Sequence, residues 1–362
     1  MKIRKQDLEP IAEGAAFLGT GGGGDPYIGR LVAEALFERY GEPEMIEASE
    51  LDDDANVYIS AMMGAPTVLV EKIIGGPELD LAISALEKYT GRQADAILPA
   101  EMGGCNSMLP LAVAAMRGLP VINADGMGRA FPELQMVSFN VHGVSASPMS
   151  MANEHGESII INARDSHETE NKARQLIIGM GGSAAISCYP MSGAKVKQTA
   201  IPGTLSLAKG IGESLSQGRK QNKPIDNLVD YLAGTKYYSQ ARRLFSGKIE
   251  SISNRVEGGF TLGECHIRGI GEKSQQILTV EFQNENLIAR LDGQLIAMVP
   301  DLICLVDTDT GTPITTEALK YGQRLCVIAA NVPPIMRSEK ALNIWGPRAF
   351  GYDFDFTPIE KL

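Results

Sequence analysis

The 362-residue chain has few of the residues that bind metals or form disulfides, with five cysteines and four histidines. The number of cysteines is odd and no two form a Cys-x-x-Cys pair, which argues against a disulfide framework and against zinc-finger spacing. Cys265 and His266 are adjacent, so on a strand their side chains would point to opposite faces and chelate a metal poorly. No cofactor is assigned on this basis, but carboxylates remain available to hold a catalytic divalent metal.

Long apolar runs and basic clusters are also missing. No apolar stretch reaches the ~18 residues that a helix needs to span a bilayer. The formal net charge is −11 and no basic run stands out, so neither nucleic acid nor an anionic membrane is an expected partner. The first residues, MKIRKQDLEP, include acids and a proline before any apolar stretch, unlike a signal peptide. We therefore predict a cytoplasmic protein.

The first 240 residues alternate between helix-like and strand-like segments. The composition, 44% hydrophobic and 21% charged, is that of an ordinary globular protein, and the length favours two domains. Strand, short helix and strand in close succession predict parallel neighbours in a sheet. The predicted helices are residues 7–18, 27–40, 79–89, 107–117, 168–178 and 204–215, and the predicted strands are residues 56–61, 94–98, 120–123, 136–142, 158–162, 183–188 and 194–201.

After about residue 241 the pattern changes to short runs separated by Gly, Asn or Asp turns. Residues 277–283 alternate clearly, with Leu278, Val280 and Phe282 on one face. Several short strands at this spacing indicate a small barrel or sandwich. A polar, turn-rich stretch at 217–234 marks the boundary, so we predict an α/β domain over 1–240 and a β-rich domain over 241–362. The aromatic end of the chain is expected to return to the first domain.

Residues 100–132 carry the strongest indication of a site. Glu101 and Asp125 each follow an apolar strand-like run, and each lies in a glycine-rich turn. Because sites form beyond the carboxyl ends of parallel strands, both acids are expected to open into one crevice. A carboxylate there can activate water, and two carboxylates can hold a divalent cation. The alternative for each acid is helix capping or turn chemistry.

A run of glycines near the N-terminus is the second candidate. It has the spacing Gly-x-Gly-x-x-Gly, but it follows a helical segment, whereas a dinucleotide-binding loop follows a strand. The N–H groups of Gly21, Gly22, Gly23 and Gly24 could still bind a carbonyl oxygen, a carboxylate or a phosphate at a helix N-terminus. The alternative is a helix–helix turn in which Asp25 caps the next helix. A nucleotide- or phosphate-binding enzyme thus remains a further alternative.

Four other residues near these segments are candidates with a competing structural interpretation. Arg129 could bind a substrate carboxylate or ring carbonyl, or form a salt bridge within the protein. Asn106 fits the role of a turn or cap residue better than that of a residue that binds substrate amides. Cys105 precedes a helix, where a thiolate would be stabilised, but it has no histidine nearby in sequence and buried cysteine is usually inert. His142 follows a predicted strand and could reach the site, or could be a core or turn residue.

Six segments together resemble the DUF917 family, also described as S-methyl thiohydantoin desulfurases, which often accompany hydantoinase- or oxoprolinase-type proteins. They lie in both halves of the chain and cover it nearly from end to end. The segments are LGTGGGGDP (18–26), EMGGCN (101–106), LPVINADGMGRAFPELQM (119–136), IPGTLSLA (201–208), VPDLICLVDTDTGTPITTEALKYG (299–322) and GPRAFGYDFDF (346–356).

The resemblance implies an α/β first domain that carries a smaller β-barrel-like C-terminal domain, with a family-level boundary nearer residue 165. It also implies a homo-oligomer and hydrolysis of a hydantoin-like heterocycle, in which a methylthio group leaves an S-methyl thiohydantoin as methanethiol. Asp125 or Glu101 would then be the base, and the N–H groups of Gly103 and Gly104, or of the glycine run, would bind ring carbonyls. A metal-bound hydroxide is the alternative nucleophile. The alternative function is a non-catalytic subunit or binding module that partners a hydantoinase or oxoprolinase.

Overall fold

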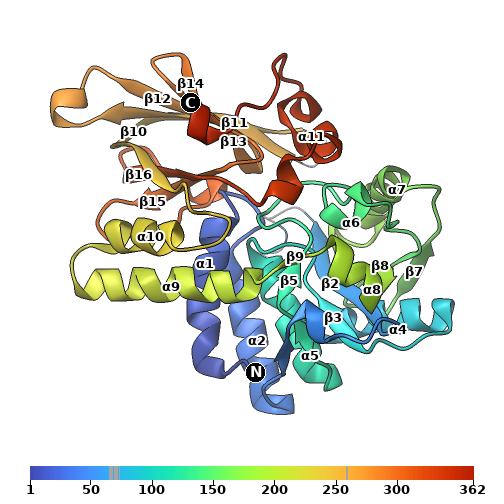
Figure 1. Cartoon of the computed structure of the whole chain (residues 1–362). Coiled ribbons are helices and arrows are strands. Elements are labelled where there is room, and N and C mark those ends of the chain that lie inside the picture. The colour runs from blue at the N-terminus through green and yellow to red at the C-terminus, as the bar shows by residue number, and fades with distance from the viewer. Residues whose placement is uncertain (65–67, 69–71, 73, 258–259) are drawn as a thin grey trace.

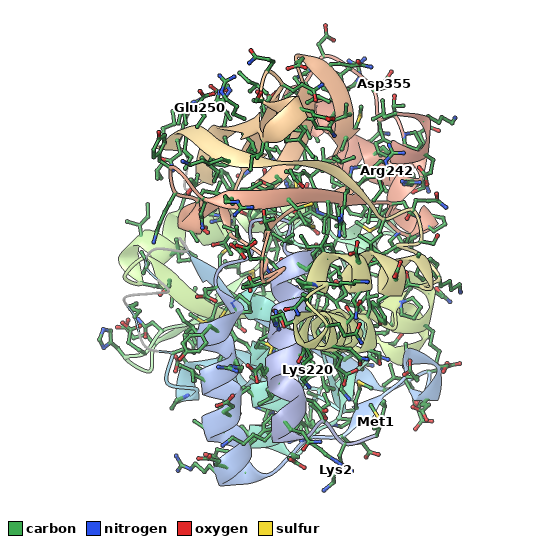
Figure 2. The ribbon with its side chains drawn as sticks, turned by 90° about the vertical axis from the view of Figure 1, so that its left-hand side faces the viewer. Met1, Lys2, Lys220, Arg242, Glu250 and Asp355 are labelled. Carbon is green, nitrogen blue, oxygen red and sulfur yellow. The ribbon has the colours of Figure 1, made fainter. Side chains whose placement is uncertain are left out.

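Two sheets form the frame of the protein. The computed structural model describes residues 1–64, 68, 72, 74–257 and 260–362. These residues contain a seven-stranded sheet within 45–192, a second seven-stranded sheet within 242–330, and one two-stranded sheet. The second seven-stranded sheet lies above the first, with α9 (Thr204–Lys220) and α10 (Pro224–Ala233) beneath it (Figure 1). Figure 2 shows Glu250 and Asp355 at the end formed by the second sheet, and Met1 and Lys2 at the opposite end.

The first sheet is mixed, with the strand order β1-β4-β3-β2-β8-β6-β7. Its β1, β4, β3 and β2 pair in parallel, whereas β8, β6 and β7 pair antiparallel. The predicted parallel strand–helix–strand unit is confirmed as β3, α5 (Leu109–Arg117) and β4. The strands are β1 (Met45–Ile46), β2 (Asn56–Gly64), β3 (Ala96–Leu98), β4 (Val121–Ile122), β6 (Met149–Ala152), β7 (Ser158–Ile161) and β8 (Ser183–Ser192), and β5 (Ala124–Asp125) pairs separately with β9 (Ile201–Pro202).

Helices cover this sheet, and α1 also contacts α9 and the second sheet. The start of α2 is as predicted, because Asp25 accepts a hydrogen bond from the Tyr27 N–H and Pro26 occupies the first turn. None of the described helices has the length and apolar character needed to cross a membrane. The remaining α-helices are α1 (Leu8–Leu18), α2 (Pro26–Tyr40), α4 (Pro77–Thr90), α5 (Leu109–Arg117), α6 (Ser138–Val141), α7 (Ser166–Gly179), α8 (Gly193–Thr199) and α11 (Glu339–Trp345).

Short 3₁₀ helices lie at several turns. They are η1 (Lys5–Asp7), η2 (Ala48–Glu50), η3 (Cys105–Ser107), η4 (Gly271–Lys273), η5 (Thr316–Ala318), η6 (Pro334–Arg337), η7 (Pro347–Phe350) and η8 (Ile359–Lys361).

Two of the predicted strands are wrong. Residues 136–142 contain the short helix α6, and residues 194–201 mostly form α8. The Ser192 hydroxyl caps α8 by accepting from the Lys195 N–H, and Phe139 of α6 packs against Tyr189 with ring centroids 5.7 Å apart. Apolar runs this short fit a period of two and a period of 3.6 equally well, so tertiary packing decides between them.

The second sheet is antiparallel throughout its described pairs, with the order β14-β13-β12-β11-β10-β16-β15. It curls into a half-barrel, so that Asn286 Nδ2 of β13 donates to the Ile303 carbonyl of β15 at 2.8 Å. The predicted alternation in β12 is confirmed, since Leu278, Val280 and Phe282 are all buried in its core. The strands are β10 (Arg242–Glu257), β11 (Phe260–Gly269), β12 (Ile277–Gln283), β13 (Glu285–Leu291), β14 (Gln294–Met298), β15 (Leu302–Asp307) and β16 (Arg324–Ala330).

The C-terminal segment leaves the second sheet and packs against a loop of the first part of the chain. Trp345 is fully buried and stacks on Phe131 with ring centroids 5.3 Å apart. Its indole Nε1 donates to the Met336 carbonyl at 2.9 Å, so the buried polar group is satisfied. The α/β fold class with a curled second sheet is therefore the one predicted.

Candidate active site

A cleft lies where the carboxyl ends of β2 and β3 face the turn between β12 and β13. It contains about 760 Å³ of unfilled space, part of which is open to solvent. Met62 and Phe131 contribute apolar surface, while Glu101, Asn106 and Glu285 contribute polar groups. Ligands of open parallel sheets bind at this edge, and the second sheet supplies the opposite wall.

Glu101 is a buried carboxyl group on the cleft wall. Its side chain follows β3, only 6% of the residue is exposed, and Oε1 accepts a hydrogen bond from Asn106 Nδ2 at 2.9 Å. Its Oε2 has no hydrogen-bond partner among the described residues. Burial raises the pKa of Glu101 to about 8, and repulsion from the carboxylates of Glu285 and Asp125 contributes to the rise. A carboxyl with such a pKa can give or take a proton near neutral pH.

Asn106 orients Glu101 through the main chain of β2. The Met62 N–H donates to Asn106 Oδ1 at 2.8 Å, and Asn106 Nδ2 donates back to the Met62 carbonyl at 3.1 Å. These two bonds hold the Asn106 side chain against the main chain of β2 in the way that a paired strand would be held. The other N–H of the same amide donates to Glu101. Asn106 therefore acts on the carboxyl group as a fixed hydrogen-bond donor.

Glu285 is the second buried carboxyl that lines the cleft, and it comes from the other sheet. The chain reverses between β12 and β13 at Asn284, whose φ of +57° is a left-handed conformation that asparagine tolerates better than most residues. Only 2% of Glu285 is exposed, and its Oε2 has no hydrogen-bond partner among the described residues. Burial raises the pKa of Glu285 to about 8.

The glycine run packs directly against the side chain of Glu285. A Cβ atom on Gly22 would lie 2.1 Å from Glu285 Oε1, so the carboxyl occupies the space where a side chain would be. The Asn286 N–H donates to the Thr20 carbonyl at 2.7 Å and joins the two segments directly. Hydrogen bonding from the Gly23 N–H lowers the pKa of Glu285 and opposes part of the effect of burial.

The run is therefore not an open cradle of N–H groups. Gly21 packs against the turn of the second sheet, and the Gly22 N–H donates to the Gly19 carbonyl at 2.9 Å. Only Gly23 and Gly24 of the run line the cleft among the described residues. Gly21 and Gly22 are therefore not placed to bind a ligand in the cleft.

Gly103 and Gly104 pack against the same run, main chain on main chain. The Cys105 N–H donates to the Gly23 carbonyl at 2.9 Å, and the Gly104 N–H donates to the Ala15 carbonyl at 3.2 Å. A Cβ atom on Gly104 would lie 2.0 Å from the Gly23 carbonyl oxygen. These glycines are needed for the close approach of two loops, and the Gly104 N–H is already used within the protein.

Gly104→Ala is expected to destabilise the fold strongly. Its φ of +65° costs a residue with a Cβ about 1–2 kcal/mol, and the overlap with a carbonyl oxygen adds to that, for a total of about 3 kcal/mol or more. Urea unfolding measures the loss. Gly118→Ala is the matched control, because Gly118 has the same φ of +65° and no atom within 4 Å of an added Cβ. Equal losses in the two variants would contradict the close approach of the loops.

Asp125 lies behind the cleft wall. Its Oδ2 accepts from the N–H groups of Met102 at 2.7 Å, Met127 at 3.1 Å and Gly128 at 2.7 Å. Burial raises its pKa to about 7, although these hydrogen bonds oppose the rise. Its Oδ1 is buried without a hydrogen-bond partner among the described residues, but Asp125 is not among those that line the cleft. The structure thus does not bring Asp125 and Glu101 to one space, because the shorter acid folds back on its own turn.

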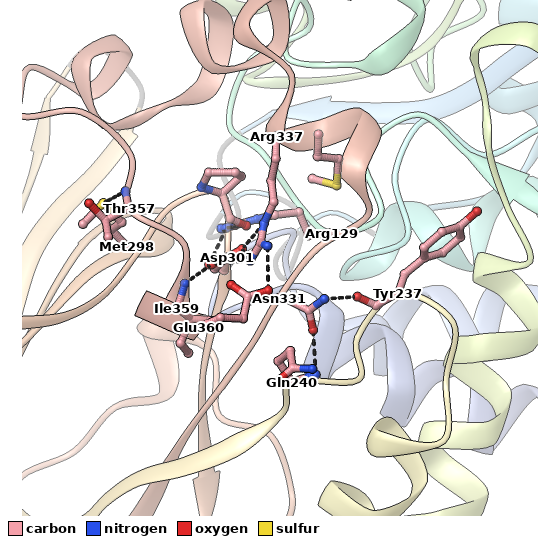
Figure 3. Close-up of polar contacts among 12 residues, drawn as sticks. Arg129, Tyr237, Gln240, Met298, Asp301, Asn331, Arg337, Thr357, Ile359 and Glu360 are labelled. Atoms are coloured by element: carbon pink, nitrogen blue, oxygen red, sulfur yellow. Dashed lines mark hydrogen bonds and ion pairs between the residues drawn. The ribbon is translucent and has the colours of Figure 1, made fainter. Parts of the chain in front are cut away.

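Arg129 is fully buried beside Asp301, and its donors are used within the protein (Figure 3). Its guanidinium donates to Thr20 Oγ1 at 2.6 Å and to the Pro300 carbonyl at 2.9 Å, and it lies 4.6 Å from the centroid of the Phe131 ring. Burial lowers the pKa of Arg129 to about 10. Arg129 does not line the cleft among the described residues, and its hydrogen-bond partners there are uncharged groups, so neither the expected contact with a substrate nor the expected salt bridge fits this position.

The remaining candidates lie elsewhere or are inert. Burial raises the pKa of Cys105 to about 12, so its thiol stays protonated at neutral pH, and the residue is buried beside Gly29. Asp25 is exposed as the cap of α2, and His142 is exposed at the end of α6. Neither Asp25 nor His142 lines the cleft among the described residues.

The cleft offers a divalent cation two unpartnered carboxylate oxygens, Oε2 of Glu101 and Oε2 of Glu285. In the part of the chain that the structure describes, no group of three or more His, Cys, Asp or Glu side chains is placed to hold a metal. A cation here would therefore depend on water or substrate for most of its ligands.

The buried acids make stability depend on pH. The pKa values of Glu101 and Glu285 rise from 4.5 to about 8, so the folded protein keeps protons that the unfolded chain loses. The free energy of unfolding is expected to decrease as pH rises through this window, by about 1 kcal/mol per pH unit for each carboxyl, and to level off above about pH 8. Urea unfolding at several pH values measures this. Glu101→Gln should reduce the slope, and stability that rises with pH across the window would contradict the assignment.

The fold and the cleft define a two-sheet α/β protein with buried acids between its sheets, and the comparisons agree with this class. Models of the S-Me-THD-like N-terminal and C-terminal domains match residues 6–163 and 164–359, so the chain belongs to the S-Me-THD-like family. The two models meet between β7 and α7, so β8 of the first sheet falls in the C-terminal match. No curated protein matches the chain.

An X-ray crystal structure of a protein from Chromobacterium violaceum has a similar fold, with a TM-score of 0.84 and 24% sequence identity. The match covers 99% of this chain and 100% of that one, so it includes both sheets.

Proposed function

We propose that the protein is a hydrolase that removes the methylthio group from an S-methyl thiohydantoin or a closely related ring. Membership of the S-Me-THD-like family supports the substrate class. The observation that carries the proposal is the pair Glu101 and Glu285, two buried carboxyl groups that line one cleft from different sheets, each with an unpartnered oxygen. Two carboxyls with pKa values near neutral pH can divide the roles of acid and base, one protonated and one ionised.

The chemistry needs one acid and one base. Water attacks C2 of the ring and gives a proton to the ionised carboxylate, while the protonated carboxyl donates to the ring nitrogen next to C2. In the second step the new hydroxyl on C2 gives its proton to the carboxylate that protonated the ring nitrogen. The C2=O bond forms, the C2–S bond breaks, and methanethiolate takes the other proton. Hydantoin and methanethiol leave, and the pair regains its starting state.

This scheme predicts a bell-shaped pH profile. The pair must hold one proton, and its two carboxyls have pKa values of about 8. The rate of methanethiol release is expected to be highest near that pH, to fall at lower pH as the base becomes protonated, and to fall at higher pH as the acid ionises. Steady-state kcat/KM across this range measures it. A profile that is flat across both limbs would exclude the pair as acid and base.

The function is tested by trapping methanethiol with a thiol reagent while purified protein acts on an S-methyl thiohydantoin. Glu101→Gln is expected to lower turnover by about 10²- to 10⁴-fold in a folded protein. Asp125→Asn is expected to reduce stability but to keep turnover in the folded fraction, since Asp125 binds main-chain N–H groups behind the wall. Absence of turnover with and without added divalent metal, together with copurification with a larger hydrolase, would favour the binding-module alternative.

A further inference from the structure

We propose that Arg174 of α7 binds the C4 carbonyl oxygen of the substrate ring and so orients the ring within the cleft. Arg174 lines the same cleft as Glu101 and Glu285, and it is the one basic residue that does so in the described part of the chain. This inference rests on the proposed function, and it adds a substrate-binding residue to the two carboxyl groups.

Arg174 contacts both sides of the cleft. Its Nη2 donates to the Pro132 carbonyl at 3.0 Å, and its Cζ lies 5.1 Å from the centroid of the Phe260 ring at the start of β11. The next residue, Thr261, donates its N–H to Asn284 Oδ1 at 2.9 Å and accepts from the Asn284 N–H at 2.8 Å. Asn284 belongs to the second sheet and Pro132 to the loop after β5, so the guanidinium lies between the two parts of the chain that enclose the cleft.

The loop after β5 also runs beside Glu101. Its Gly126 N–H donates to the carbonyl of Ala100, the residue before Glu101, at 2.9 Å. Further along the loop, the nitrogen of Ala130 would lie 2.7 Å from a Cβ atom added to Gly103. The carboxyl of Glu101 and the guanidinium therefore lie along one loop, and both line the cleft.

Three of the five N–H groups of this guanidinium have no hydrogen-bond partner in the described part of the chain. Nε donates to Glu170 Oε1 at 2.6 Å, and one N–H of Nη2 donates to Pro132. The two N–H groups of Nη1 and the second one of Nη2 are left, and 25% of the side chain is exposed. Because a guanidinium is planar and keeps its charge, these donors can form charge-assisted hydrogen bonds with an acceptor oxygen in the cleft.

Glu170 fixes the guanidinium and limits the kind of acceptor that fits. It is buried one helical turn before Arg174, and its Oε2 accepts from the Leu134 N–H at 3.1 Å, so the carboxylate is held from two sides. Both Glu170 and Glu133 line the cleft. A carboxylate on the ligand would be repelled by these two acids, whereas a neutral carbonyl oxygen would not. The acceptor that suits Arg174 is therefore a carbonyl group.

The substrate ring offers one such oxygen. An S-methyl thiohydantoin has a single ring carbonyl, at C4, and one ring nitrogen lies between C4 and the C2 atom that water attacks. Until that nitrogen takes its proton, the negative charge that develops on it is shared with the C4 oxygen by conjugation. A hydrogen bond from Arg174 to this oxygen is therefore stronger in the transition state than in the bound substrate, and it should contribute to kcat as well as to binding.

The test compares two ligands that differ at C4. Hydantoin has a carbonyl group there, and imidazolidin-2-one has a methylene group. In calorimetric titrations the wild type is expected to bind hydantoin about 10- to 10²-fold more tightly. Arg174→Met keeps a long side chain beside Phe260 but has no donor, so it should bind the two ligands equally. Lys172→Gln is the matched control and should keep the preference, because Lys172 pairs with Glu168 on the same helix and does not line the cleft among the described residues.

The inference is overturned if the wild type binds the two ligands equally, or if Arg174→Met keeps the preference for hydantoin. Should Arg174→Met fail to fold, Arg174→Lys takes its place. It keeps the charge but not the planar donors, so the preference should fall, and an unchanged preference is then the contradicting result.

Because the titrations need no turnover, they separate this inference from the proposed function. A preference for hydantoin that depends on Arg174, in a protein that releases no methanethiol, would keep the binding role and reject the reaction. Methanethiol release by a protein that binds both ligands equally would keep the reaction and reject the role of Arg174.

Discussion

Glu285→Gln is expected to lower kcat for methanethiol release by about 10²- to 10⁴-fold, the contribution of a positioned general acid or base. Glutamine has nearly the same size and can still accept the hydrogen bond from Gly23, but it can neither give nor take a proton in the reaction. The side chain at position 285 should therefore still pack against the glycine run, and the turn between β12 and β13 should stay in place. Steady-state kinetics of the folded variant measures the loss.

Glu281→Gln is the matched control for this substitution. Glu281 lies on β12, pairs with Arg290 at 3.1 Å and accepts from the Tyr352 hydroxyl, and it does not line the cleft among the described residues. Its replacement should leave kcat within about twofold, because a half-exposed ion pair contributes little to stability and nothing to the chemistry. If Glu285→Gln behaves like this control, Glu285 is not part of the reaction.

Gly22→Ala is expected to cost about 10²-fold in kcat with little loss of stability. The added methyl group would lie 2.1 Å from Glu285 Oε1, so the carboxyl must move away from Gly22. A displacement of about 1 Å in a catalytic group is enough for such a loss. The atoms that must move are the end of a flexible side chain, and the backbone of Gly22 is not left-handed, so the free energy of unfolding should change by about 1 kcal/mol or less.

Two variants make this prediction specific. Gly179→Ala is the matched control, since Gly179 also lacks a left-handed φ and has no atom within 4 Å of an added Cβ. It should keep full activity. The double variant Gly22→Ala with Glu285→Asp should recover part of the activity, because the shorter acid leaves room for the methyl group. A Gly22→Ala enzyme with unchanged kcat would show that the packing of Glu285 against Gly22 does not matter for turnover.

The sequence predicts the position of Glu101 well, because local patterns determine it. Apolar strands followed by glycine-rich turns place Glu101 at the carboxyl end of β3, where the cleft lies. Asp125 follows its strand in the same way, and the sequence cannot separate the two acids. The difference is side-chain length, since aspartate reaches the N–H groups two and three residues further on, whereas glutamate extends beyond its own turn.

The position of Glu285 depends on contacts between distant parts of the chain. Glu285 follows an ordinary alternating strand and precedes another, so its sequence indicates only a polar hairpin turn. The curl of the second sheet brings that turn onto the glycine run, and only the folded structure contains this contact. For the same reason the sequence offers Arg129 as a substrate binder or a salt-bridge partner, although its partners include the Thr20 hydroxyl and carbonyl groups from β13 and from the turn before β15.

A crystal structure of Glu285→Gln with bound S-methyl thiohydantoin tests the central claim most directly. The account predicts that the ring lies between Glu101 and the substituted side chain at position 285. A water molecule should lie about 3–3.5 Å from C2 on the side of one of these two residues, with a ring nitrogen within hydrogen-bond distance of the other. The contradicting result is a ring bound away from both positions, or one whose C2 faces Asp125 instead.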